Sequence, residues 1–279
     1  MGESAHIFRF KKFNIINERS AMKVNTDGVL LGAAMTIRPD DRCLLDIGTG
    51  TGTIALMAAQ RLAEISSCND CNKSVPSVSE RSITINAIDI DEPSASEAAQ
   101  NFRNSPWADM LHVYNMSLAE FASALPPQHP DSPQSSESVL MNVLVPRSYD
   151  LIFSNPPYFE DSLTAPDERK STARHTSEGL SYREVFDFAK ETLAPGGRVA
   201  LVLPADQENA VCRYARMSGL HLSKILRIRT VPRKSPTRMI VEFSRYRPDA
   251  PEDTILTIQN EGQYTQEYLS LTKDFYLFA

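Results

Sequence analysis

Two hydrophobic periodicities alternate along the chain. Short apolar runs of the kind that form buried strands occur at residues 42–47, 83–89, 110–114, 149–153 and 199–203. Segments with helical spacing of apolar residues lie at 51–62, 93–104, 182–193 and 207–217. Two more strands, at 221–230 and 237–245, follow each other without a helix between them. This order predicts an α/β fold: a Rossmann-like, doubly wound and mostly parallel sheet of seven strands, with an antiparallel hairpin at one edge.

Two polar stretches interrupt this alternation. Residues 66–82 are rich in Ser, and residues 121–148 are rich in Pro, Ser and Gln. Such sequences bury little apolar surface, so we interpret both as surface insertions within one domain. The chain then divides into an N-terminal segment (1–40), a main domain (41–248) and a C-terminal addition (249–279) that contains a short strand, a turn at Glu261-Gly262 and a helical segment.

Composition excludes several classes of protein. No apolar run approaches the roughly 18 residues of a membrane span, and the N-terminus lacks the apolar core of a secretory signal. With only four Cys, these features predict a cytoplasmic protein. Cys68-x2-Cys71 supplies too few ligands for zinc, so we expect no metal. The net charge of −6 excludes a basic coat over the whole surface but not a local basic face. Nothing in the sequence indicates an obligatory protein partner.

A glycine-rich turn follows the first predicted strand of the main domain. Gly48, Gly50 and Gly52 let the backbone turn sharply and bring a ligand against main-chain N–H groups. Asp46, two residues ahead of the first Gly, suits a cationic methionine group better than a phosphate. Asp89 ends the second strand, where a carboxylate can accept both hydroxyls of a ribose. The alternative is a glycine-rich turn without a ligand.

A second motif, Asn155-Pro156-Pro157-Tyr158, ends the fourth strand. The two prolines make the turn rigid, and the Asn155 side-chain oxygen and the Pro156 carbonyl can accept both hydrogens of a planar amino group. This pairing favours the pyramidal nitrogen that forms as the amine attacks a methyl group. Tyr158 offers a flat face on which a base can stack. The alternative is a Pro-rich turn that only closes the strand.

Together these motifs resemble those of class I S-adenosylmethionine-dependent methyltransferases that act on amino groups. Residues 10–13, 21–33 and 173–176 are similar to flanking segments of the bacterial valine-tRNA adenine N6-methyltransferases. The resemblance implies a class I methyltransferase fold, S-adenosyl-L-methionine as methyl donor, and N6-methylation of adenosine 37 in tRNA. It also implies that Asp27 lies near the methionine end of the cofactor. Related enzymes carry an acid after the third strand, whereas this chain has Asn115-Met116-Ser117, so Ser117 is the remaining candidate there.

Basic residues concentrate near the last strand pair. Arg233, Lys234 and Arg238 flank the predicted hairpin loop, within a stretch that holds eight basic residues between Lys224 and Arg247 and a single acid, Glu242. We expect them to contact RNA phosphates. The alternative is a charged edge that prevents strand pairing. Further candidate RNA contacts are Lys11 and Lys12 near the N-terminus and Arg174 and His175 after the Asn-Pro-Pro-Tyr motif.

Two classes of function compete with adenosine methylation in tRNA. One is another amino methylation, of guanine, of ribosomal RNA or of a protein glutamine. The glutamine enzymes carry a helical domain before the glycine motif, whereas only 45 residues precede Asp46 here. The other class is an RNA-binding protein that kept the fold without catalysis. The intact Asn-Pro-Pro-Tyr motif argues against it, because binding alone does not need that pair of acceptors.

Overall fold

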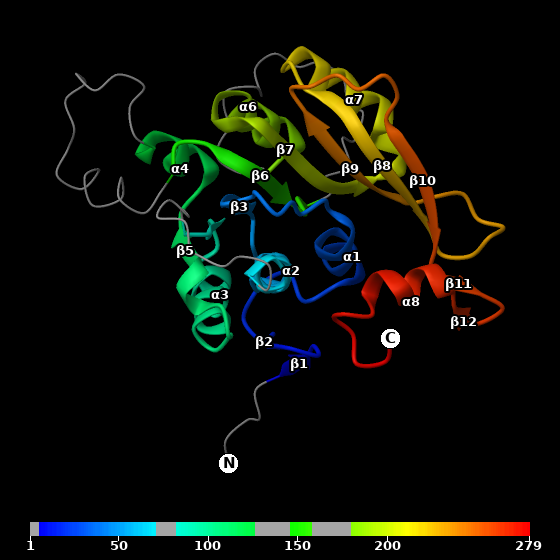
Figure 1. The fold of residues 1–279 in the computed structure, drawn as a ribbon, viewed down its shortest axis with the longest axis horizontal. Helices are drawn as coiled ribbons and strands as arrows, with labels where there is room; N and C mark the ends of the chain where they lie inside the picture. The colour runs from blue at the N-terminus through cyan, green and yellow to red at the C-terminus, as the bar shows by residue number, and fades with distance from the viewer. Residues whose placement is uncertain (1–5, 71–81, 126–145, 158–179) are drawn as a thin grey trace, which may run out of the picture.

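A single large sheet organises the molecule in the computed structural model, which describes residues 6–70, 82–125, 146–157 and 180–279. The sheet has eight strands in the order β10-β8-β9-β7-β6-β3-β4-β5 (Figure 1). Their bounds are β3 Cys43–Ile47, β4 Thr84–Asp89, β5 Leu111–Asn115, β6 Tyr149–Ser154, β7 Leu193–Pro204, β8 His221–Arg229, β9 Arg238–Ser244 and β10 Glu252–Thr257. Seven of these strands run parallel, and β9 runs opposite to its neighbours β7 and β8. The predicted doubly wound α/β class is confirmed.

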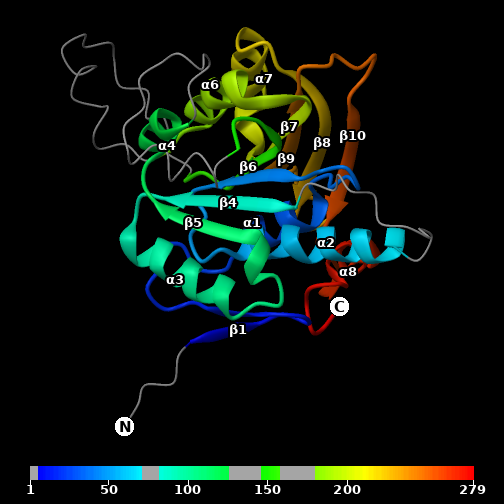
Figure 2. The same cartoon turned by 60° about the vertical axis from the view of Figure 1, so that its left-hand side comes forward.

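Helices cover both faces of the sheet, as Figure 2 shows most clearly. One face carries α1 (Thr26–Ala34), α2 (Thr53–Asp70), α3 (Glu92–Arg103) and α8 (Gln266–Thr272). The other carries α4 (Leu118–Ala124), α6 (Tyr182–Thr192) and α7 (Glu208–Met217). Two hydrophobic clusters fill these layers, one on each side of the sheet. The strands at the centre are therefore buried on both faces, which explains their continuous apolar runs.

The sheet differs from the expectation at one edge. We expected seven strands with the β8–β9 hairpin at the edge, but β10 pairs in parallel with β8 and adds an eighth strand. Leu256 of β10 is buried in the same cluster as Ile228 of β8, so the strand is held by apolar packing as well as by its backbone. Periodicity identified this strand but not its partner, because pairing depends on contacts that are distant in sequence.

The two polar stretches both begin within helices. Helix α2 continues to Asp70, and the Ser67 hydroxyl donates to the Ala63 carbonyl one turn earlier, which lets a serine remain in the helix. Helix α4 occupies the first residues of the second insertion, through Ala124. Phe121 is fully buried there and fixes this helix to the sheet. Residues 66–70 and 121–124 therefore belong to helices, and the interpretation of both stretches as insertions stays a prediction.

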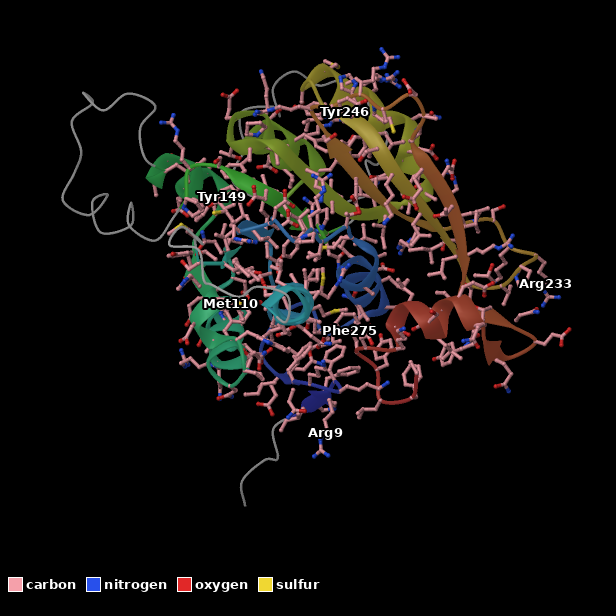
Figure 3. The ribbon with its side chains drawn as sticks, in the orientation of Figure 1. Arg9, Met110, Tyr149, Arg233, Tyr246 and Phe275 are labelled. Atoms are coloured by element: carbon pink, nitrogen blue, oxygen red, sulfur yellow. The ribbon has the colours of Figure 1, made fainter. Side chains whose placement is uncertain are left out.

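The terminal segments pack beside each other against the same core. The N-terminus forms a hairpin, β1 (Ile7–Arg9) with β2 (Asn14–Ile16), and a second hairpin, β11 (Gln259–Asn260) with β12 (Gln263–Tyr264), turns at Glu261-Gly262 as predicted. Phe10 stacks on Phe13 and on Tyr276 near the C-terminus. Figure 3 shows Phe275 above the strand that carries Arg9. Each terminal segment is therefore an integral part of the hydrophobic core.

Candidate active site at the carboxyl ends of the parallel strands

The candidate site residues meet where the parallel strands end. Strands β3, β4 and β6 are neighbours, and Ile47 pairs with Ser154 and with Ile88 at their carboxyl ends. The Ser154 hydroxyl donates to the Ile47 carbonyl over 2.6 Å, so the end of β6 is tied to the start of the glycine loop. Ligands of open α/β sheets bind outside these strand ends. The two sequence motifs, separated by about a hundred residues in the chain, are therefore adjacent.

The glycine loop connects β3 to α2 through backbone conformations that L-residues rarely adopt. Gly48, Gly50 and Gly52 have φ values of 71°, 56° and 81°. The N–H groups of Gly48 and Thr49 donate to the Ile88 carbonyl at 2.9 and 3.0 Å, which fixes the loop to β4. Gly48 is exposed and Gly50 half-buried, so this part of the loop is open to a ligand.

Gly52 has a different role from the first two glycines. It is buried, and a Cβ added there would lie 2.5 Å from Phe102 Cε1 of α3. The missing side chain therefore makes room for α3 to pack against the loop, as the third glycine does in related turns. We grouped Gly52 with the cofactor-binding residues; the structure supports a packing role, and its contact with a cofactor stays a prediction.

Asp46 is a fully buried carboxylate with one unsatisfied oxygen. Oδ2 accepts a hydrogen bond of 2.7 Å from the Thr49 hydroxyl, whereas Oδ1 has no partner among the described residues. Burial raises the pKa of Asp46 to about 7; Thr49 opposes this shift and the charge of Asp89 adds to it. A buried carboxylate of this kind is unfavourable without a cationic or hydrogen-bonding partner. It fits a site that receives a positively charged ligand.

Asp89 holds the glycine loop and also remains half-exposed. Its Oδ2 accepts from the Gly50 N–H at 2.8 Å and its Oδ1 from the Asp91 N–H at 2.9 Å. Burial raises the pKa of Asp89, and these two backbone hydrogen bonds oppose the shift. A carboxylate can accept about four hydrogen bonds, so two hydroxyl groups can still be accommodated. Asp91 itself caps α3 through a 3.0 Å bond from the Ser94 N–H.

Asn155 lies at the end of β6, beside the glycine loop. The residue is buried, with 7% of its surface exposed, and its Nδ2 donates to Met22 Sδ at 3.5 Å. Pro156 is buried and Pro157 is exposed, so the chain reaches the surface two residues after Asn155. Tyr158, Arg174 and His175 lie outside the described residues. Met22 was missed by the sequence analysis, because a methionine carries no pattern that marks a polar contact.

Asp27, a predicted cofactor neighbour, and Arg238, a predicted RNA contact, form an ion pair. Asp27 is in the first turn of α1, and its Oδ2 accepts from Arg238 Nε at 3.0 Å. We predicted Asp27 beside the cofactor and Arg238 at the RNA. Because β9 starts at Arg238, where β7 ends, the pair lies at the carboxyl edge of the sheet. The pair thus borders the candidate site, and the ligand contacts of both residues stay predictions.

Ser117 caps α4. Its hydroxyl accepts from the Glu120 N–H at 3.2 Å, and its backbone N–H donates to Glu120 Oε2 at 2.8 Å, which together form a capping box. The hydroxyl also donates to Glu120 Oε2 at 2.8 Å. The hydroxyl is thus engaged within the protein. A contact from Ser117 to the cofactor adenine stays a prediction, and the capping bonds weaken the case for it.

The basic candidates are dispersed over the surface. Lys11 Nζ donates to the carbonyls of Lys273 and Ala279, and Lys12 pairs with Glu64 at 2.7 Å. These bonds tie the N-terminal hairpin to the C-terminus and to α2. Arg233 and Lys234 are exposed in the loop between β8 and β9, and Figure 3 shows Arg233 at the tip of that loop, far from Arg9. The loop pair is thus distant from the N-terminal lysines.

Five other basic residues of the 224–247 stretch are engaged within the protein. Lys224 lies 3.7 Å from Glu242, Arg227 pairs with Glu208 and Asp253, and Arg229 donates to Thr257. Arg238 pairs with Asp27, and Arg245 donates to the Lys190 carbonyl at 2.7 Å. The basic stretch is therefore not one continuous track.

Within the four described ranges, no group of three His, Cys, Asp or Glu side chains is arranged to hold a metal ion. None of the helices in these ranges is long and apolar enough to cross a membrane.

The sheet order, the glycine loop and the motif after β6 define a class I methyltransferase fold. A solved structure titled a predicted O-methyltransferase, from Agrobacterium tumefaciens, shares this fold with a TM-score of 0.56 at 16% identity, covering 89% of this chain and 96% of that one. A putative transferase from Pyrococcus horikoshii gives a TM-score of 0.51 at 11% identity, covering 87% and 72%. No protein-family model matches the chain.

Curated relatives match almost the entire chain. The tRNA1(Val) (adenine(37)-N6)-methyltransferase of Parabacteroides distasonis is 38% identical over 273 residues, 97% of each chain. Proteins of the same name from Bacteroides fragilis and Tolumonas auensis are 35% and 32% identical; they cover 98% of this chain and 99% and 97% of their own. The chain belongs to the family of tRNA1(Val) (adenine(37)-N6)-methyltransferases.

Proposed function

We propose that the protein transfers a methyl group from S-adenosyl-L-methionine to the N6 amino group of adenosine 37 in valine tRNA. The observation that carries the proposal is the position of Asn155. It is buried at the end of β6, next to the glycine loop, in a chain that matches its family over 97% of its length. Since tRNA is the proposed substrate, the protein would act in the cytoplasm.

The described residues fit S-adenosyl-L-methionine. When bound, this cofactor supplies an electrophilic methyl group on a positively charged sulfur. Gly48 and Gly50 leave room for a ligand against the backbone, and the unsatisfied Asp46 Oδ1 suits a cationic group nearby. Asp89 is placed to accept the ribose hydroxyls, since it keeps acceptor capacity beside Gly50. Asp27 would border the methionine end.

Asn155 and Pro156 would orient the adenine. The Asn155 side-chain oxygen and the Pro156 carbonyl accept the two N6 hydrogens, and this pair favours a nitrogen whose lone pair is directed at the electrophile. No side-chain base is needed, because the nitrogen becomes a strong acid only after it is methylated. Tyr158 would stack on the base. A base in the anticodon loop is single-stranded, so it reaches such a pocket at a low unstacking cost.

Arg233 and Lys234 are the RNA contacts that the arrangement supports best. The β8–β9 loop that carries them follows the end of β8 and precedes Arg238, at the carboxyl edge of the sheet where Asn155 also lies. Arg174 and His175 lie outside the described residues and stay candidate RNA contacts from the sequence. Lys11 and Lys12 support the proposal less, because their ammonium groups are bound to the C-terminus and to Glu64.

Mass spectrometry of nucleosides tests the substrate. Purified protein is incubated with S-adenosylmethionine and unmodified valine tRNA, and in parallel with the same tRNA carrying guanosine at position 37. We expect N6-methyladenosine from the first tRNA only. Equal N6-methyladenosine from both would place the methylated adenosine elsewhere. No product from either, with cofactor binding intact by calorimetry, would contradict a tRNA substrate and favour ribosomal RNA or a protein glutamine.

A further inference from the structure

A short segment before α1 lies across the glycine loop. We call residues Asn17–Val24 the N-terminal strap. A Cβ added to Gly50 would be 3.6 Å from both the Met22 carbonyl oxygen and the Ser20 hydroxyl, so the strap lies beside the loop. On its other side, Met22 contacts Asn155. The strap therefore joins the cofactor side of the site to the side proposed for adenine.

Buried side chains of α3 hold the strap in place. The Glu97 carboxylate, which is fully buried, accepts from the N–H groups of Glu18 and Arg19 at 2.8 and 2.7 Å and of Ser20 at 3.3 Å. The Ser94 hydroxyl lies 3.0 Å from that of Ser20, which in turn donates to the Met22 carbonyl at 3.0 Å. Three charge-assisted bonds to one carboxylate fix a loop far better than exposed contacts do. The backbone of the strap is thus held in place as far as the Met22 carbonyl.

In the hydrogen bond between Met22 and Asn155, the Asn155 amide nitrogen is the donor and the Met22 sulfur the acceptor. A thioether sulfur has lone pairs and no hydrogen, so it can accept from an amide nitrogen but cannot donate to an amide oxygen. The Asn155 Nδ2 to Met22 Sδ distance of 3.5 Å is a hydrogen bond to sulfur. If the amide were turned by 180°, its oxygen would face the sulfur lone pairs. The sulfur therefore favours the amide orientation in which Nδ2 faces the strap and Oδ1 is directed away from it.

We propose that Met22 is a positioning residue that sets the orientation of the Asn155 amide for the incoming amino group. This inference rests on the proposed function, since it assigns the Asn155 oxygen to the substrate. Met22 touches neither reacting atom in this account. It acts by keeping the amide from turning, which would present two donors to an amino group that also carries only donors.

Steady-state kinetics with three variants tests the assignment. Met22→Leu keeps the apolar volume and removes the acceptor, so kcat should fall about three- to ten-fold, as expected for one lost neutral hydrogen bond. KM for tRNA and Kd for the cofactor should stay within about two-fold. Met22→Gln restores an acceptor and should recover most of kcat. Met217→Leu, at an exposed methionine on α7, is the matched control.

Comparing the change in kcat with the change in Kd for the cofactor separates a positioning role of Met22 from a packing role. An unchanged kcat in Met22→Leu would overturn the proposal. So would a loss that appears equally in Kd for the cofactor, or one that Met22→Gln leaves in place, because both would indicate packing of the strap.

A second measurement does not depend on activity. The side-chain amide resonance of Asn155, identified by its absence in Asn155→Asp, should shift and broaden in Met22→Leu and not in Met217→Leu. An unmoved resonance would exclude the contact. If wild type methylates no RNA but the resonance responds as expected, the proposed function fails while the contact stands.

Discussion

The burial of the Asp46 carboxylate is unfavourable for folding, and the same burial suits the binding of a cationic ligand. Its carboxylate is removed from water, has one bond from Thr49, and leaves Oδ1 without a partner in the described part of the chain. Burial raises the pKa of Asp46 to about 7, so this carboxyl group takes up a proton near neutral pH. A ligand with a positive charge would favour the ionised form instead. Binding and protonation are therefore opposed at this residue.

The pH dependence of stability follows from this shift. The folded-state pKa lies above the unfolded value, so the folded protein holds an extra proton between about pH 4 and 7, and stability falls as pH rises through that window. Replacing Asp46 with Asn should flatten this fall and make the cofactor-free protein more stable at pH 8, by up to a few kcal/mol. Urea unfolding of wild type and Asp46→Asn at pH 5–8 measures the free energy of unfolding of each.

The matched control for Asp46→Asn is Asp40→Asn, at an exposed carboxylate before β3. Its unfolding free energy should follow wild type across the range. If the unfolding free energies of wild type and Asp46→Asn changed equally with pH, Asp46 would not be the source of the pH dependence. Separately, Asp46→Asn should weaken cofactor binding by calorimetry, since the variant cannot offer a negative charge to the ligand.

At the scale of elements, the glycine loop depends on the helix that follows β4. Helix α3 supplies Phe102 against Gly52, and its Asn101 donates to the Thr51 carbonyl at 2.9 Å. Asn101 also bonds the backbone of Ile16 in β2, through its oxygen at 2.8 Å and its nitrogen at 3.0 Å. One helix therefore positions both the loop and the N-terminal hairpin.

Gly52→Ala should destabilise the protein by about 2–4 kcal/mol, because it combines a left-handed backbone with a side chain forced against Phe102. Gly219→Ala is the matched comparison, since Gly219 has a φ of 76° with no atom within 4 Å of an added Cβ. It should cost only the backbone strain, about 1–2 kcal/mol. Thermal or urea unfolding measures both. Equal losses would mean that Phe102 does not crowd Gly52.

Much of the element order could be predicted from sequence, and the reasons are local. The runs around Leu45, Ile88 and Ile152 are buried on both faces, so their apolar character marks the strands directly. The extent of the helices was harder to predict than their order. Phe121 is a buried aromatic residue within a stretch whose average composition is polar, so composition alone predicted a surface segment there. The position of β10 depended on pairing with β8, which no local pattern encodes.

At the scale of the molecule, the glycine loop, Asp89 and Asn155 lie together at the carboxyl ends of the parallel strands. β3, β4 and β6 end there, as does β7, and the loop with Arg233 and Lys234 follows β8 at the same edge. The amino ends of the same strands carry a buried ion pair, in which Arg198 Nη1 lies 2.9 Å from Asp41 Oδ1. Motifs predicted the first set, because each follows a strand. The contacts between Asn155 and Met22 and between Asp27 and Arg238 join residues 133 and 211 positions apart, which motifs cannot reveal.

The surface charge at this edge gives a prediction for tRNA binding. Arg233→Ala with Lys234→Ala should weaken the affinity for tRNA and lower its slope against the logarithm of salt concentration by roughly 1.4–1.8, the effect of two phosphate contacts. Cofactor affinity should not change. Filter binding at several salt concentrations measures the slope.

The control pair for tRNA binding is Arg245→Ala with Arg247→Ala, exposed residues that follow the other end of β9, near Tyr246 in Figure 3. These changes should leave the salt slope as in wild type. If both pairs reduced it equally, the RNA would not be localised at the β8–β9 loop. If neither did, the phosphate contacts would lie elsewhere.

The central claim is that Asn155 carries the methylation of adenosine, and the rate of Asn155→Ala tests it most directly. With saturating S-adenosylmethionine and unmodified valine tRNA, we predict that the variant forms N6-methyladenosine at least about 100-fold more slowly than wild type, as for other placed polar groups in active sites. Its Kd for the cofactor should stay within about two-fold. A variant that retains a third or more of the wild-type kcat would contradict the account.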